Sequence, residues 1–323
     1  MGLLLPATLF VAFTNGANAN SKGVASLYGS GTTGLRTALA WGTAATFAGG
    51  LAALFFARGL IQTFSGKGLV PDALTESPDF LLAVALGGAF TSFLATRLSF
   101  PVSTTHALTG ALLGAGLASG DHTVRVEPLL KAFVQPLLLS PLLAVALGAS
   151  LYFLLKALRW LPGHRTRLLD TAHFLSAGAA SFARGLNDTP KMAALLAVGH
   201  AADMRWAIIS VAVTTALGGL LDARNVARTL GEKVTGMNPG EGFAANLATA
   251  LLVSTASYHA LPVSTTHVSV GSLLGVGAVT RQVYWGNVGQ IFLSWLITVP
   301  CGALLAALAV WGLAFFSRLG EAG

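Results

Sequence analysis

The chain has 323 residues, of which 54% are hydrophobic and 10% charged, and its formal net charge at pH 7 is +7. Soluble domains carry about 25% charged residues, so this composition argues against a soluble enzyme and against a disordered chain. A helix that crosses a membrane needs about 20 mostly apolar residues, and the sequence contains many such stretches. We therefore expect an all-α polytopic membrane protein.

Apolar stretches alternate along the chain with short polar or glycine-containing segments. The stretches that we expect to form membrane helices are residues 3–13, 39–57, 80–98, 129–155, 172–182, 207–221, 244–257 and 291–316. Polar segments follow the first and the fifth stretch, at residues 15–22 and 184–191. Ser/Thr-rich elements follow the third and the seventh, at residues 101–117 and 262–279. The same order of features thus occurs twice.

The hexapeptide Pro-Val-Ser-Thr-Thr-His at residues 101–106 recurs letter for letter at residues 262–267. Extended to sixteen residues, the two copies share 11 identities. The two polar segments also match each other, because Gly, Asn and Lys stand at the same spacing in both. Two matched pairs of motifs in one order indicate an internal duplication. The sequence therefore predicts two homologous halves, residues 1–158 and 170–323.

Between these halves we expect a basic linker, residues 159–169, in the cytoplasm. The basic side chains in and beside it are Lys156, Arg159, His164, Arg165 and Arg167. Cytoplasmic loops of membrane proteins are enriched in Lys and Arg, so we expect no nucleic-acid partner. The single cysteine, Cys301, lies in an apolar stretch and permits no intramolecular disulfide.

The duplicated hexapeptide has the chemistry of an anion site. Its proline disfavours continuation of the preceding helix, and a helix that begins inside the membrane presents free N–H groups and a positive dipole end. The hydroxyl donors beside these expected helix starts are Ser103, Thr104, Thr105, Ser264, Thr265 and Thr266. The alternative is that these residues only cap the helices. His106 and His267 follow the hydroxyls, and for both we favour a packing or capping role over titration during transport.

The polar segments contain four ionisable residues that are functional candidates if they lie at membrane depth. They are Lys22, Arg184, Asp188 and Lys191. Asp188 is the one acid among them, and it could bind a coupling cation, accept a proton or pair with a lysine. Arg184 has the alternative role of an anchor at the membrane surface.

These motifs resemble the inorganic phosphate transporter family, the PiT-type permeases, over essentially the whole chain. The resemblance implies two inverted-topology repeats, each with a broken helix and a re-entrant helical hairpin, and cation-coupled uptake of phosphate. It also implies a shared anion site. The residues that this carries over are Asn18, Asn20, Asn187 and Asp188 with Ser103, Thr104, Thr105, Ser264, Thr265 and Thr266.

The sequence departs from the family pattern at two places. Ala19 stands where the family has an aspartate, and the second copy keeps that residue as Asp188. Lys22 and Lys191 stand where the pattern often has asparagine. An ammonium group there could compensate the charge of Asp188 and occupy the place of a bound sodium ion. We therefore expect coupling to protons rather than to sodium, with no cofactor and no metal site.

The identity of the oxyanion stays open between phosphate and sulfate. Phosphate carries a proton that a carboxylate can accept, whereas a carboxylate repels sulfate. Asp188 favours phosphate, and the loss of its counterpart at Ala19 weakens that preference. A passive anion channel and an intramembrane hydrolase are the less favoured alternatives, and duplicated hydroxyls argue against a single catalytic centre. We expect a multi-pass protein of the prokaryotic cell membrane, with lipid as a partner and a homodimer possible.

Overall fold

The computed structural model describes residues 2–56, 58–64, 66, 68–120, 124–161 and 164–321. Residue 57 of the expected helix 39–57 and residues 162 and 163 of the expected linker lie outside this part of the chain. The helices of the first half are α1 (Leu4–Ala19), α2 (Ala25–Gly29), α3 (Leu35–Phe56), α4 (Arg58–Phe64), α5 (Asp72–Thr75), α6 (Pro78–Arg97), α7 (Thr104–Ala118), α8 (Val126–Pro128), a π-helical turn (Leu129–Val134) and α9 (Gln135–Ala157). Those of the second half are α10 (Arg167–Val198), α11 (Met204–Asp222), α12 (Arg224–Lys233), α13 (Pro239–Tyr258), α14 (Thr265–Thr280) and α15 (Trp285–Glu321).

Five helical segments among the described residues are long and apolar enough to cross a membrane. They are α3, α6, α11, the segment Leu129–Ala157 that contains α9, and the part Trp285–Leu319 of α15. Large apolar side chains such as Leu142 and Leu296 are 67% and 74% exposed on these helices, as is expected of a surface that contacts lipid. The prediction of an all-α polytopic membrane protein is confirmed.

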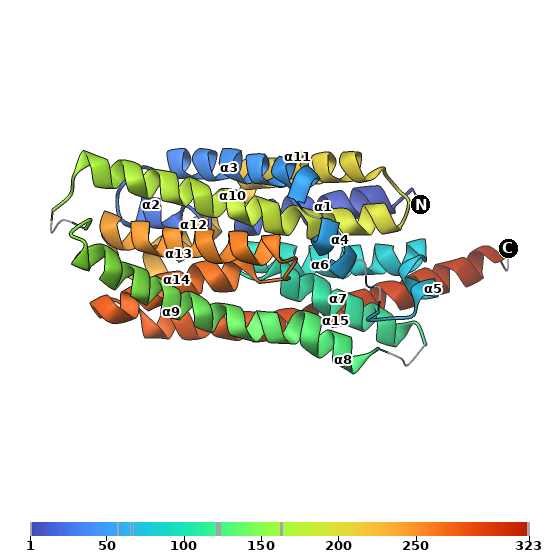
Figure 1. Ribbon diagram of the computed structural model, residues 1–323. Helices are drawn as coiled ribbons and strands as arrows, with labels where there is room; N and C mark the ends of the chain where they lie inside the picture. The colour runs from blue at the N-terminus through green and yellow to red at the C-terminus, as the bar shows by residue number, and fades with distance from the viewer. Residues whose placement is uncertain are drawn as a thin grey trace.

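The two halves are interlocked, because corresponding helices pack across the boundary between them. Helix α1 packs on α11 while α10 packs on α3, and α7 packs on α15 while α14 packs on α9. Figure 1 shows that α1 runs inward from the end of the bundle where the N-terminus lies, whereas α10 enters from the opposite end. Inverted repeats require such an antiparallel relation of corresponding helices, and the inversion of the two halves as a whole stays a prediction. Neither half packs as a separate domain.

Glycine permits the closest of these contacts. A Cβ atom at Gly16 of α1 would collide with the backbone carbonyl oxygen of Thr215 in α11. A Cβ atom at Gly185 of α10 would collide with the carbonyl oxygen of Thr46 in α3 in the same way. Each of these residues in the second half lies 169 positions from its counterpart in the first. Small residues allow helix backbones to approach closely in membranes, so both polar segments are held by the same kind of crossing.

The two polar segments differ in backbone structure. In the first half α1 ends at Ala19, and a turn leads into α2. In the second half the expectation of a broken helix is wrong, because α10 continues through the polar segment to Val198 with Pro190 inside it. Proline removes one helical hydrogen bond, but neighbouring helices let membrane helices tolerate it. Helix α10 packs on α3, α11 and α13, and this packing keeps its polar segment helical.

The glycine contact yields a first prediction. We expect Gly185→Ala to lower the melting temperature of the detergent-solubilised protein, because forcing apart two packed helices costs about 1–3 kcal/mol. The matched control is Gly289→Ala on α15, where an added Cβ meets no atom within 4 Å. Thermal unfolding of both variants measures the effect. Equal melting temperatures for the two variants would contradict the role given to this crossing.

Candidate functional site

Two helical hairpins carry the duplicated hexapeptides to the middle of the bundle, where their tips meet (Figure 1). The first hairpin is α6–α7 and the second is α13–α14. Ser103 lies just before α7 and accepts a hydrogen bond from the backbone N–H of His106 at 3.1 Å. Ser264 caps α14 in the same way, accepting from His267 N–H at 3.2 Å. The capping role considered for the hydroxyls thus holds for these two serines.

The third hydroxyl of each hexapeptide joins the two hairpins. Thr105 donates to the backbone carbonyl oxygen of Val263 at 3.2 Å, and Thr266 donates to that of Val102 at 2.8 Å. Each residue of the second half lies 161 positions after its counterpart, so the two bonds correspond to each other. All four residues are buried. The hairpin tips therefore bind each other through the residues that the sequence assigned to an anion site.

Lys22 lies at the junction of the two hairpin tips. It follows the end of α1 in the chain, and its side chain is buried. Its Nζ donates to the carbonyl oxygen of Val102 at 2.7 Å and to Thr266 Oγ1 at 2.5 Å. The ammonium group thus binds one atom from each hairpin, and both of these atoms are neutral oxygens.

Lys191 on α10 has the corresponding partners in the other half. Its Nζ donates to the carbonyl oxygen of Val263 and to Thr105 Oγ1, each at 2.8 Å. It also donates to Asp188 Oδ1 at 3.0 Å. The three N–H bonds of this ammonium group therefore all have partners within the protein.

Asp188 is the acid about which the buried charges are arranged. Besides Lys191, it accepts from Thr265 Oγ1 at 3.0 Å and from Arg184 Nη1 at 3.4 Å, both on Oδ2. Two cations and a hydroxyl therefore surround one carboxylate whose side chain is 5% exposed. Breaking a buried ion pair costs about 3–5 kcal/mol because it leaves an uncompensated charge, so this carboxylate fixes the positions of its three partners.

Arg184 connects this cluster to the first half. Its guanidinium donates to the side-chain oxygen of Asn20, to Thr46 Oγ1 at 3.0 Å and to Asn15 Oδ1 at 3.5 Å. Asn15 in turn donates through Nδ2 to Thr104 Oγ1 at 2.8 Å. The Arg184 side chain is 2% exposed, and its Nε has no hydrogen-bond partner among the described residues. This burial excludes the alternative of an anchor at the membrane surface.

Asn18 and Asn187 hold the hairpins against α1 and α10. Asn18 Nδ2 donates to Thr96 Oγ1 at 3.1 Å and to the carbonyl oxygen of Phe100 at 2.9 Å. Asn187 Nδ2 donates to Ser257 Oγ at 2.9 Å, and Ser257 is the counterpart of Thr96 in the second half. These amides position the hairpins, while a direct contact with an anion stays a prediction for both.

The two histidines lie side by side in the first turns of α7 and α14. The ring centroids of His106 and His267 are 4.5 Å apart, and His267 stacks on Trp295 with centroids 3.8 Å apart. Trp295 Nε1 donates to the carbonyl oxygen of Pro101 at 3.0 Å. These contacts support the packing role expected of the histidines.

The centre of the bundle has more buried positive than negative charge. Among the described residues, the cations Lys22, Arg184 and Lys191 and the acid Asp188 form the buried cluster at the hairpin tips. The part of the chain that the structure describes contains no group of three or more His, Cys, Asp and Glu side chains that could hold a metal ion. A tetrahedral oxyanion is the ligand that suits convergent cations and hydroxyls.

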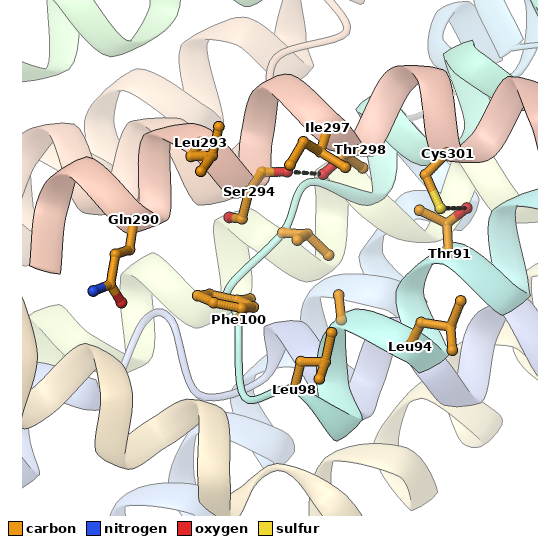
Figure 2. Close-up of a pocket in the computed structure, with 12 residues that line it drawn as sticks. Thr91, Leu94, Leu98, Phe100, Gln290, Leu293, Ser294, Ile297, Thr298 and Cys301 are labelled. Carbon is orange, nitrogen blue, oxygen red and sulfur yellow. Dashed lines mark hydrogen bonds between the residues drawn. The ribbon is translucent and has the colours of Figure 1, made fainter.

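A separate pocket beside the first hairpin tip has a different character (Figure 2). Its volume is about 340 Å³, and its walls come from the end of α6, the segment 98–102 and α15. Its lining is mostly apolar, with Leu94, Leu98 and Phe100 facing Leu293 and Ile297. None of the residues that line it is charged, so it offers no counter-charge to an oxyanion, and the candidate anion site remains the buried cluster.

Sequence reasoning missed four residues that hold the site. Thr96 and Ser257 lie 161 positions apart, so a longer comparison of the repeats would have found a hydroxyl in both copies. Asn15 stands in a recognised polar segment but was not assigned a role. Thr46 lies in an apolar helix with no motif around it, and only the crossing of α3 with α10 brings it to Arg184.

Comparisons with known proteins agree with this architecture. A family model described as "Phosphate transporter family" matches residues 15–167 and again residues 162–306. A "Probable low-affinity inorganic phosphate transporter" of Rhizobium meliloti (strain 1021) is 30% identical over 319 residues, which cover 94% of each chain. Another of that description from Bacillus subtilis (strain 168) is 30% identical over 269 residues, covering 78% of this chain and 79% of that protein.

The fold also matches a solved structure described as "The sodium-dependent phosphate transporter". The TM-score is 0.85 with 24% sequence identity, and the match covers 98% of this chain and 100% of the other. The sequence relatives identify a multi-pass transporter of the cell membrane and not an enzyme. The family model covers both halves of the chain, and the chain therefore belongs to the phosphate transporter family.

Proposed function

We propose that this chain carries inorganic phosphate into the cell by cation-coupled symport and that the anion binds at the junction of the two hairpin tips. The sequence relatives are described as inorganic phosphate transporters, which supports the substrate. The observation that carries the location is the buried excess of cations at Lys22, Arg184 and Lys191. Charge-assisted hydrogen bonds from such groups are the strong contacts of oxyanion sites.

In the structure most donors of this site bond to protein atoms. Lys191 has three acceptors and Lys22 has two. When an oxyanion binds at the junction, some of these donors therefore leave their protein acceptors and donate to the oxygens of the anion. Because Lys22 and Lys191 also hold the hairpins together, binding of the anion acts directly on the contact between the two halves. This is the property that a transporter with two repeats requires, since alternating access moves one part against the other around the site.

We propose protons as the coupling ion. Free carbonyl groups at interrupted helices are ligands for coupling cations in transporters. Here the carbonyl oxygens of Val102 and Val263 each accept a bond from a lysine ammonium group. The lysine ammonium groups thus occupy the carbonyl oxygens that could otherwise coordinate a sodium ion.

Sulfate remains a second candidate for one specific reason. Both oxygens of Asp188 already accept bonds from Lys191, Arg184 and Thr265. A carboxylate with its charge compensated in this way repels sulfate less than a free carboxylate does. Phosphate is nevertheless the substrate that the relatives favour.

Uptake into proteoliposomes tests the substrate and the coupling ion together. With an inward proton gradient and no sodium, we expect radiolabelled phosphate to accumulate and the accumulation to collapse when a protonophore is added. Sulfate uptake is measured in parallel, and liposomes without protein provide the background. Phosphate uptake that requires sodium would contradict the proton proposal. Sulfate uptake without phosphate uptake would contradict the proposed substrate.

Substitution of Asp188 tests the site. We expect Asp188→Asn to change the phosphate affinity and to destabilise the protein by about 3–5 kcal/mol, because it leaves Lys191 and Arg184 without their buried counter-charge. The matched control is Glu127→Gln, which removes the acid of the exposed pair with Lys131 and costs at most about 1 kcal/mol. Radioligand binding and thermal unfolding measure both effects. Normal phosphate affinity in Asp188→Asn would place the anion elsewhere.

A further inference from the structure

The two lysines of the site differ in one respect. Lys22 and Lys191 have corresponding hydrogen bonds to a hairpin carbonyl and to a threonine of the opposite half. Lys191 also has a carboxylate three residues before it, at Asp188, and the atoms Nζ and Oδ1 lie 3.0 Å apart. The corresponding residue before Lys22 is Ala19, which is 1% exposed. The duplicated site therefore lacks an acid on one side.

This difference leaves the buried cluster with unequal charge. It contains the cations Lys22, Lys191 and Arg184 and the one carboxylate of Asp188. Among the described side chains, Lys22 has no acid within 4.0 Å, although it is 2% exposed. Neutral carbonyl and hydroxyl oxygens orient an ammonium group but do not cancel its charge. An anion bound beside the cluster favours the charged form of Lys22, and with all four groups ionised the cluster carries an excess of two positive charges.

We infer that the anion carried by this site is doubly charged, so that hydrogen phosphate rather than dihydrogen phosphate is bound, and that Ala19 sets this preference. The inference rests on the proposed function, because it concerns the anion that binds at the same junction. A dianion matches the excess of two charges, whereas a monoanion leaves one buried charge uncompensated.

The remaining donors lie on the same groups. The ammonium group of Lys22 has three N–H bonds, of which two have partners in the structure. The buried Nε of Arg184 has none among the described residues. The oxygens of Asp188, in contrast, already accept bonds from Lys191, Arg184 and Thr265. The donors left for an anion are thus on Lys22 and Arg184, whereas the oxygens of Asp188 are already occupied.

The test changes the charge of the site without changing its size. Ala19→Asp repeats before Lys22 the arrangement of Asp188 and Lys191 and lowers the excess from two charges to one. Ala19→Asn has nearly the same volume and no charge, so it is the matched control for crowding at this buried position. Sulfate and perchlorate serve as probes because both are tetrahedral and carry no proton near neutral pH. Sulfate is a dianion and perchlorate is a monoanion.

Competition against radiolabelled phosphate is measured on the purified full chain at one fixed pH, so that no protein group titrates between samples. We expect sulfate to compete at least about tenfold better than perchlorate in the unmodified chain and in Ala19→Asn. We expect Ala19→Asp to reduce this ratio by about tenfold or more. An equal ratio in Ala19→Asp and Ala19→Asn would overturn the inference, as would equal competition by the two probes in the unmodified chain.

A second variant covers the case in which Ala19→Asp does not fold. Lys22→Gln removes one positive charge from the same place and should also reduce the ratio of sulfate to perchlorate competition, whereas Lys131→Gln on the exposed surface should not. An unchanged ratio in a folded Lys22→Gln protein would overturn the inference. The proposed function fails separately, by the absence of phosphate binding to the unmodified chain.

Discussion

The contact of Asp188 with Lys191 and Arg184 is the constraint on which the centre of this protein depends. Charges removed from water are tolerated only when they are paired and hydrogen-bonded. Here one carboxylate fixes two cations, and those cations reach residues from both halves. The close crossings of α1 with α11 and of α10 with α3 bring these side chains within reach. The ion pairs of Asp188 therefore depend on the close packing of these helices.

The same contacts determine how the hairpins can move. Each hairpin tip binds the other through a threonine and is also bound by a lysine. Because the bonds correspond in the two halves, separation of the tips breaks them in matched pairs. In the proposed site, an anion that takes over donors from Lys22 weakens the bonds between the tips. In this proposal, anion binding and movement of the hairpins involve the same side chains.

Much of this arrangement could be predicted from the sequence, and the limits have identifiable causes. The duplicated hexapeptide and polar segments led to Lys22, Asp188, Lys191 and the threonines because a repeat shows which positions correspond. The continuous course of α10 through Pro190 could not be predicted, because the packing around a helix decides whether it tolerates proline. The role of Thr46 depends on a helix crossing, and spacing along the chain does not reveal such a contact.

The fixed lysines and the coupling ion have different tasks. In the proposed site, Lys22 and Lys191 balance the charge of a bound anion, but they remain in the protein and contribute nothing to the charge that crosses the membrane. Moving a dianion inward against a potential of about 100 mV, negative inside, costs roughly 4.6 kcal/mol, since each elementary charge costs about 2.3 kcal/mol. Accumulation of the anion therefore requires cations that travel with it. It follows that an aspartate in place of Ala19 would alter which anion is bound, while the energy of accumulation would still come from the transported cations.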